Sequence, residues 1–342
     1  MKLIDQFSTE VYGPSLGWAK PDGEPVLEPV IIEILKSKPL QRLKKIEQHG
    51  PMVWAWKDAH ETRYDHSVGV MLLIRRFGGT LEEQIAGLLH DVSHTAFSHA
   101  IDYSHRLNTK SFHEDNQERI IRQSEIPAIL KKHRIEISAV LKSDIKLLET
   151  DLPDLSADRV DYCFRDGFAV GFVKMPAIKK MLAALIRHRG EIIFNNPIQA
   201  YKFAKLFVRN NKENYASDFG ALFNQVLADA LDIGKEQGII DEDDLFSNDE
   251  AVKDKLLKSG DPEIIRLLSL ISQKTKIIRS KKNYNYHLRV IRVRVVDPKI
   301  LIDGKISQLS EVSSEYAKLK TISQSKQESG FFVKIKPNAR IP

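Results

Sequence analysis

The feature that most constrains this chain is a concentration of histidines in its first third. Seven of the eleven histidines lie between residues 60 and 113. Histidine titrates near neutral pH and is a frequent metal ligand, so this density predicts a metal or proton-transfer site. The sharpest part is the adjacent pair His90-Asp91, with His94 one turn further on. A buried aspartate beside a buried histidine is costly unless a cation or hydrogen bonds satisfy both.

The pair is expected at the end of an apolar helix. Thr80 and Glu83 have the spacing of a capping box, and apolar residues recur at helical spacing after them. By itself, such a pair also fits a structural hydrogen bond that closes the helix. His66 begins a second apolar helix, and Asp158 begins a third, with Ser156 as its expected N-cap. These two residues favour the metal interpretation.

The ordered set resembles the HD superfamily of metal-dependent phosphohydrolases, and within it the deoxynucleoside triphosphate triphosphohydrolase branch. The resemblance covers residues 27–225. It rests on Gln41-Arg42-Leu43, Gln48, Arg63-x-x-His66-Ser67, His90-Asp91-x-x-His94, Phe97-Ser98-His99, His113-Glu114 and Asp158-x-x-Asp161-Tyr162-x-x-Arg165-Asp166. The expected fold is mainly α: an HD-domain helical bundle with a small C-terminal α+β lobe.

The resemblance implies a role for each site residue. The metal ligands would be His66, His90, Asp91 and Asp158. The catalytic residues would be His99, Asp102, His113 and Glu114, with His113 or an Asp102-oriented His99 moving the proton. The substrate contacts would be Gln48, Arg63, His94, Arg159, Tyr162, Asp166, Arg209 and Tyr215. On the third helix, i, i+4, i+7, i+8 spacing places Asp158, Tyr162, Arg165 and Asp166 on one face.

One divalent metal is the expected cofactor. Histidine and carboxylate ligands suit iron, manganese, zinc or magnesium without choosing among them. The single cysteine, Cys163, excludes an internal disulfide and a cysteine-cluster metal site.

Some positions depart from the family or have simpler interpretations. His49 stands where the family has an apolar residue beneath the deoxyribose, which puts a preference for deoxy over ribo sugars in doubt. Ser93 and Thr95-Ala96 replace glycine and Gly-Pro, so the turn after the metal pair could differ in shape. The simpler interpretations are a polar helix C-cap at Gln48-His49, an Arg63 salt bridge to Asp65 or a neighbour, and a Ser111–Glu114 helix cap.

We expect three regions: an irregular or β-like segment at 1–26, the core at 27–235, and an α+β lobe at 236–342. Within them, the pattern predicts helices in 29–48, 115–150, 197–235 and 311–323, an extended run at 53–56, strands at 286–295 and 331–335, and a hairpin turn at 302–305.

The net charge of +6 fits either an ordinary solvated surface or contact with anions. Basic residues from Lys281 to Arg294 could touch an effector nucleotide or nucleic acid, although a charged sheet face explains them more simply. No apolar run has the length of a membrane span, so a cytoplasmic protein is expected. The resemblance also implies a homo-oligomer.

The function hypothesis is metal-dependent hydrolysis of a nucleotide phosphoester, releasing triphosphate from a dNTP. A second hypothesis is another HD phosphohydrolase, acting on a nucleoside monophosphate, a guanosine polyphosphate or a different phosphoester. The third is a non-catalytic protein that binds nucleotides or nucleic acid on the same scaffold. The intact ligand set makes the third the least favoured.

Overall fold

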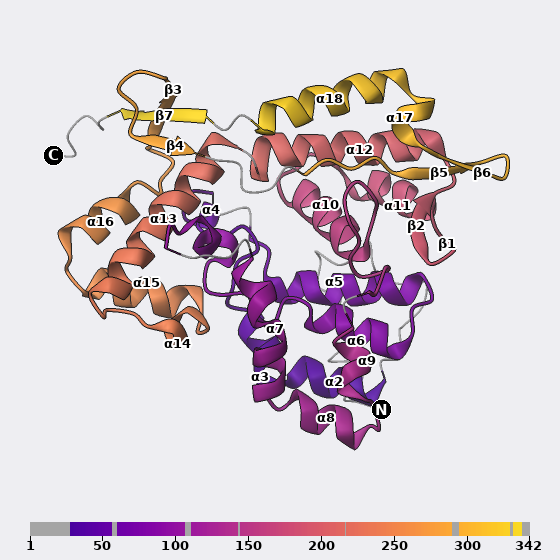
Figure 1. Ribbon diagram of the computed structural model, residues 1–342, viewed down its shortest axis with the longest axis horizontal. Helices are drawn as coiled ribbons and strands as arrows, with labels where there is room; N and C mark the ends of the chain where they lie inside the picture. The colour runs from indigo at the N-terminus through magenta and orange to yellow at the C-terminus, as the bar shows by residue number, and fades with distance from the viewer. Residues whose placement is uncertain are drawn as a thin grey trace.

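Helices make up most of the described chain, which confirms the predicted mainly α class (Figure 1). The computed structural model describes residues 28–56, 60–106, 111–142, 144–215, 217–288, 294–328 and 331–336. The segment predicted as irregular, 1–26, lies outside them. Nowhere in the described ranges is a helix both long and apolar enough to cross a bilayer.

Three helices that carry the predicted metal ligands form the centre of the first apolar core. Helix α5 (Arg63–Arg76) packs along α6 (Leu81–Leu89) and also against α10 (Ala157–Ala169). The predicted caps are confirmed, because the hydroxyls of Thr80 and Ser156 accept the N–H of the third residue of α6 and α10. Around them lie α2 (Pro29–Lys36), α3 (Lys38–Leu43), α7 (Phe112–Gln123), α8 (Ile126–Lys132), α9 (Ile137–Val140), α11 (Met175–Ala183) and α12 (Pro197–Asn210).

A glycine sets the distance between α5 and α10. A Cβ atom on Gly69 would lie 1.9 Å from Asp161 Oδ1 and 2.5 Å from Arg165 Nη2, far inside van der Waals contact. The two helices approach this closely because position 69 has no side chain. His66, one turn before Gly69, therefore lies near the start of α10.

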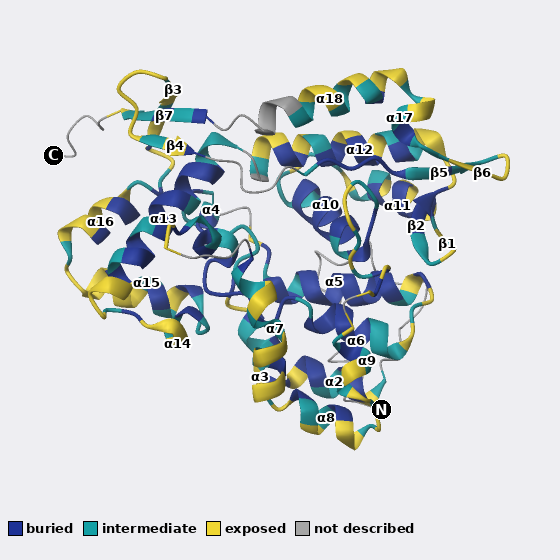
Figure 2. Cartoon of the chain, in the orientation of Figure 1, coloured by how far each residue is buried: buried dark blue, intermediate teal, exposed yellow. Residues whose placement is uncertain are grey.

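A second apolar core surrounds α13 (Asp218–Glu236) and includes α14 (Glu242–Leu245), α15 (Asp249–Lys258) and α16 (Pro262–Ser269). The loop after α6 joins the two cores, because Val92 is buried in the first while Ala96 and Phe97 are buried in the second. Figure 2 shows both buried regions.

The extended run predicted at 53–56 is wrong, since α4 (Met52–Ala55) is a helical turn. A four-residue apolar run does not distinguish strand from helix, and here tertiary packing decides. Trp54 meets Phe97 edge-on, with ring centroids 5.4 Å apart, and so attaches α4 to the loop after α6.

The strands form two separate sheets. One has the order β1-β2-β5-β6 and consists of β1 (Leu185–His188), β2 (Glu191–Phe194), β5 (Lys299–Ile302) and β6 (Lys305–Gln308). The other has the order β3-β7-β4 and consists of β3 (Lys276–Arg279), β7 (Phe331–Lys336) and β4 (Tyr286–Leu288). The predicted hairpin is confirmed, with Asp303 and Gly304 both at positive φ between β5 and β6.

The C-terminal region therefore divides into two parts, one packed beside β2 and α12 and the other beside α13. Strand β5 pairs parallel to β2 through Phe194 and Ile300, and α17 (Leu309–Val312) and α18 (Ser314–Glu328) pack on α12. The other sheet lies beside α13 instead (Figure 1). The boundary placed at residue 235 stays a prediction. Of the strand predicted at 286–295, Tyr286–Leu288 is a strand, and 289–293 lie outside the described residues.

Candidate active site

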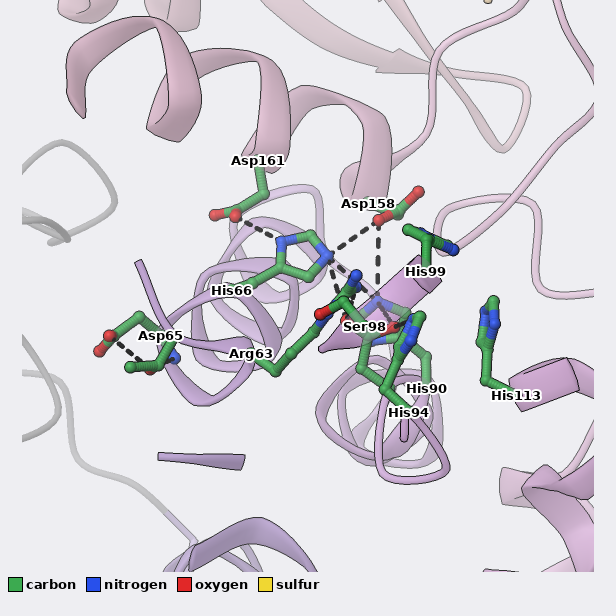
Figure 3. Close-up of polar contacts among 12 residues, drawn as sticks. Arg63, Asp65, His66, His90, His94, Ser98, His99, His113, Asp158 and Asp161 are labelled. Atoms are coloured by element: carbon green, nitrogen blue, oxygen red, sulfur yellow. Dashed lines mark hydrogen bonds and ion pairs between the residues drawn. The ribbon is translucent and has the colours of Figure 1, made fainter. Parts of the chain in front are cut away.

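The four residues predicted as metal ligands converge, with His66 on α5, His90 and Asp91 directly after α6, and Asp158 on α10. Figure 3 shows His66, His90 and Asp158 side by side. We call His66, His90, Asp91 and Asp158 the ligand cluster. His66 Nε2 lies 3.0 Å from Asp158 Oδ1 and 3.3 Å from His90 Nε2. Asp91 Oδ1 lies 3.4 Å from His90 Nε2, and Asp91 Oδ2 lies 3.7 Å from His66 Nε2. The four side chains are thus within reach of one ion.

The two imidazoles are oriented by partners outside the ligand cluster. His90 Nδ1 donates to the carbonyl of Gly87 at 2.8 Å, and a carbonyl can only accept. His66 Nδ1 lies 2.7 Å from Asp161 Oδ2. In the neutral rings both Nε2 lone pairs then face inward, toward each other and toward two carboxylates. This arrangement of donor atoms fits a divalent cation, since metal-bound histidines are oriented in this way.

The pKa values of the ligand cluster also indicate a site for a cation. Burial by itself would lower the pKa of His66, but hydrogen bonds to Asp158 and Asp161 outweigh it and raise that pKa to about 10. Burial opposes ionisation of Asp158, yet His66 and His90 hold its pKa below the usual range. The carboxylates therefore attract positive charge into the centre, where a cation can take the place of a proton.

A buried ion-pair network supports the ligand cluster from behind. Arg165 donates through Nε and Nη2 to both oxygens of Asp161, each at 2.9 Å, and its Nη1 lies 3.3 Å from Glu61 Oε2. Arg165 thus pairs with Asp161, the residue one turn before it on the helix face that begins at Asp158. Sequence reasoning gave Asp161 no role, although its i+3 spacing from Asp158 was visible.

Three further histidines gather beside the ligand cluster. The rings of His94 and His113 stack with centroids 3.8 Å apart, and ring nitrogens of both lie within 4.8 Å of one on His99. His99 Nδ1 lies 2.9 Å from Asp102 Oδ2, as the predicted i, i+3 pair requires. Burial and then the proximity of His99 lower the pKa of His113 to about 3. His113 is therefore a neutral base at physiological pH.

A cavity of about 1040 Å³ opens onto these groups. That volume matches a cofactor-sized ligand. The predicted residues that line it are Gln48, Arg63, His90, Asp91, His94, His99, Asp102, His113, Glu114, Asp158, Tyr162 and Asp166.

Two predicted substrate contacts, Arg159 and Arg209, are not among the residues that line the cavity. Arg159 donates to the backbone carbonyls of Thr150 and Asp154, because its position in the first turn of α10 points it toward the preceding loop. Arg209 is exposed, with its guanidinium over the ring of Phe172. The side chain of Tyr215 lies outside the described residues.

The simpler interpretations of the site residues have different outcomes. Arg63 does form a salt bridge, but with Asp91 of the ligand cluster rather than with Asp65: it donates to Asp91 Oδ2 at 2.7 Å, and also to Ser98 Oγ at 2.9 Å. Ser111 makes no side-chain cap to α7. Helix α3 ends at Leu43, so Gln48 and His49 do not cap it.

A second part of the cavity consists of polar groups, two of which have a buried atom that makes no hydrogen bond within the protein. We call Gln48, His49 and Asp166 the polar wall. Gln48 Oε1 and His49 Nε2 are buried and have no hydrogen-bond partner, and His49 Nε2 comes no closer than 3.4 Å to Asp166 Oδ1. Buried polar atoms in native proteins nearly always have partners. Hydroxyl groups of a ligand would supply them here.

The loop after the His90-Asp91 pair is held by two residues, Arg42 and Asp249, to which the sequence analysis gave no role. Arg42 Nη2 donates to the carbonyls of Val92 and His94, each at 2.7 Å. Asp249 accepts the N–H of Phe97 at 2.7 Å and that of Glu47 at 3.0 Å. No local pattern links Asp249 to a loop more than 150 positions earlier.

That loop is strained. Phe97 and Ser98 have φ of 63° and 56°, in the left-handed region that costs a non-glycine residue on the order of 1–2 kcal/mol. Phe97 is fully buried, which offsets that cost. The strain places Ser98 against Arg63 and leaves His99 facing the cavity.

The cavity wall also includes charged residues that no sequence pattern assigned to the site. Arg294 and Lys142 add positive charge to its wall, and Glu149 lies there with its pKa raised by burial and then by the nearby Asp158. Arg294 lies over the ring of Tyr162, with 5.5 Å from guanidinium carbon to ring centroid. The sequence pattern had placed Arg294 on a charged sheet face.

Comparison with known proteins agrees with this geometry. Residues 63–165 match the family described as HD domain. The chain belongs to the HD-domain superfamily of metal-dependent phosphohydrolases. It is 35% identical to the uncharacterized protein YdhJ of Bacillus subtilis over 92% of this chain and 97% of that protein. Over 52% of this chain it is 38% identical to the metal-dependent phosphohydrolase cns2 of Cordyceps militaris, spanning 49% of that protein.

A solved structure has the same fold. It is described as a phosphohydrolase from Bacteroides thetaiotaomicron and aligns with a TM-score of 0.64, covering 90% of this chain and 98% of its own. The sequence identity is 17%, so this likeness supports the fold alone.

Proposed function

We propose that the protein hydrolyses nucleotides, and that its substrate is a deoxynucleoside triphosphate cleaved to deoxynucleoside and triphosphate. The observation that carries this proposal is one cavity with the ligand cluster and cations in one part and the polar wall in another. A phosphorylated sugar has the same two-part chemistry. The residue pattern that resembles the triphosphohydrolase branch supports the triphosphate.

His66, His90, Asp91 and Asp158 would hold one divalent metal, of iron, manganese, zinc or magnesium type. Such an ion lowers the pKa of water and polarises a phosphoryl oxygen. The chain's own residues would move the proton. His113 is neutral at physiological pH, but a pKa of about 3 makes it a weak base. His99, whose ring Asp102 holds in a fixed orientation, is therefore the stronger candidate to accept the proton.

Charge neutralisation at the phosphates would come from Arg63, Arg294, Lys142 and a hydrogen bond from His94. The first three are the side-chain cations of the cavity wall among the described residues. Arg159 and Arg209, which the resemblance suggested for this task, contact other groups. Glu114 lies at the cavity wall, where it could bind the leaving group or a water molecule.

The polar wall would receive the sugar. Gln48 and His49 have buried atoms without partners, and Tyr162 and Asp166 lie on the same cavity surface. An apolar residue at position 49 would exclude a 2′-hydroxyl, whereas imidazole can hydrogen-bond to one. The proposal therefore includes turnover of ribonucleotides alongside dNTPs.

The test is incubation of the purified protein with dNTPs, NTPs, nucleoside monophosphates and guanosine polyphosphates, each with manganese, iron, zinc or magnesium. Chromatography then identifies the products. Tripolyphosphate with nucleoside supports the proposal, whereas orthophosphate or pyrophosphate would select another HD phosphohydrolase. The variant His90→Ala/Asp91→Ala should remain folded but lose metal and turnover. Turnover in that variant, or nucleotide binding without turnover in the wild type, would contradict it.

A homo-oligomer, a nucleotide effector and a cytoplasmic location belong to the same proposal, and the resemblance supports the first of these. Sedimentation of the protein with and without each nucleotide tests the first two. A sedimentation coefficient that stays monomeric with every nucleotide would contradict both.

A further inference from the structure

The sheet β3-β7-β4 has one buried face and one exposed face with different chemistry. On the buried side, Leu288, Phe331 and Val333 pack into the core around α13. On the other side, the strand alternation places Lys276, Ile278, His287, Phe332, Lys334 and Lys336, with Tyr284 just before β4. We call these seven residues the basic sheet face.

The basic sheet face contains no acidic residue. Its three lysines belong to strands whose register pairs Lys276 with Lys336 and Ile278 with Lys334, so the charges lie side by side. A solvated surface ordinarily mixes both signs, so this face is selectively positive.

Three aromatic rings lie together on the same face. His287 and Phe332 stack with centroids 4.1 Å apart and an angle of 10°, and Tyr284 lies 4.7 Å from Phe332. Tyr284 is 48% exposed, and His287 is also exposed. Aromatic rings are normally buried in a core. The exposed rings of Tyr284 and His287, packed against Phe332, are therefore available for stacking with a ligand.

We propose that the basic sheet face binds single-stranded nucleic acid. Lysines on adjacent strands suit a phosphate backbone, and exposed rings suit unpaired bases, which stack on aromatic side chains of a sheet. A duplex would satisfy the lysines but not the rings, because its bases are stacked on each other. An acidic protein or an anionic membrane would not require the aromatic cluster. The site is separate from the cavity, since none of the seven residues lines it.

The test is fluorescence anisotropy of the full chain with labelled oligothymidylate, oligouridylate and a duplex, each longer than the usual site size of about 4–16 nucleotides. Single strands should bind more tightly than the duplex. Lys276→Gln/Lys334→Gln/Lys336→Gln should reduce the slope of log affinity against log salt by about 2. Tyr284→Ala/His287→Ala should weaken binding about 5-fold or more, with little change in that slope.

The matched control is Lys179→Gln/Lys180→Gln/Lys202→Gln, three exposed lysines on α11 and α12 at the other end of the molecule (Figure 1). It should bind as the wild type does. All three variants should keep the wild-type circular dichroism and nucleotide turnover.

The proposal is overturned if the wild type binds no oligonucleotide, or if the control loses as much affinity as the lysine variant. The proposal is also overturned if duplex binds as tightly as single strands and Tyr284→Ala/His287→Ala does not weaken that binding. Lysine-dependent binding to phosphatidylserine vesicles without binding to oligonucleotides overturns it as well. A change of oligomeric state in the variants, in place of lost oligonucleotide binding, would assign the face to a second copy of the chain.

Discussion

The ligand cluster and the polar wall belong to one cavity but are built in opposite ways. In the ligand cluster, the outer nitrogens of His66 and His90 have partners, and Asp161 is itself held by Arg165. In the polar wall, Gln48 Oε1 and His49 Nε2 are buried without partners. The first region is already organised without a ligand. The second presents polar atoms of the cavity wall that are not used by hydrogen bonds within the protein, so it is where substrate selection is expected.

The largest effect should follow from separating the helices that form the ligand cluster. Gly69→Ala places a methyl group on Asp161, so α5 and α10 must move apart. We expect a loss of about 1–3 kcal/mol in the free energy of unfolding. We also expect turnover to fall about 100-fold or more, because His66 and Asp158 lose their relative position. Urea denaturation and steady-state kinetics measure the two.

Gly87→Ala is the matched control. The new methyl group there would meet the flexible end of Ile74 at 2.5 Å, and that end can rotate away. Its effect on turnover should be small. Equal losses in both variants would show that helix spacing at Gly69 is not what organises the ligand cluster.

The next effect concerns the residue behind His66. Asp161→Asn keeps the shape but removes the charge that orients His66 and balances Arg165. Metal affinity should fall about 10- to 100-fold, measured by titration of the metal-free protein with manganese. Asp254→Asn, at an exposed surface pair with Lys258, should leave affinity unchanged. Unchanged metal affinity in Asp161→Asn would contradict the role of Asp161 in orienting His66 for the metal.

A third effect concerns the loop between the two regions. Burial, with a smaller contribution from Glu47, raises the pKa of Asp249 to about 7. A carboxyl group whose pKa is higher in the folded state adds stability below its unfolded pKa near 4, and that stability is lost as pH rises through 7. Asp249→Asn should therefore destabilise by about 1–3 kcal/mol at pH 5, and by less at pH 8. Urea denaturation at the two pH values measures this. The same loss at both would contradict the protonated state of Asp249.

The contrast between the regions also explains how far the sequence could predict the site. The ligand cluster comes from residues with local signals, such as the Thr80 and Ser156 caps and the His90-Asp91 pair at a helix end. Short-range rules act on such segments, so the starts of α6 and α10 are as predicted, whereas α5 begins at Arg63, three residues before His66.

Other groups depend on contacts distant in sequence. Asp249 holds Phe97 across 152 positions, and Arg294 reaches Tyr162 from beyond the predicted core. Arg159 illustrates the converse, since helical spacing gave its position but not which way a long side chain would turn. The run at 53–56 became a helix for the same reason, because Trp54 packs on a loop that no local rule could place.

The smallest effect should come from the polar wall, where one ligand hydroxyl is at issue. His49→Leu replaces an imidazole whose Nε2 makes no hydrogen bond by an apolar group of similar size, so the cavity loses a hydrogen-bonding group for a 2′-hydroxyl. The ratio of kcat/KM for NTP to that for dNTP should fall about 2- to 10-fold, which corresponds to one neutral hydrogen bond. The ligand cluster does not contact His49 in the described structure, so metal affinity should be unchanged. If the ratio does not move, selection does not occur at position 49, and the missing partners of the polar wall are supplied by water.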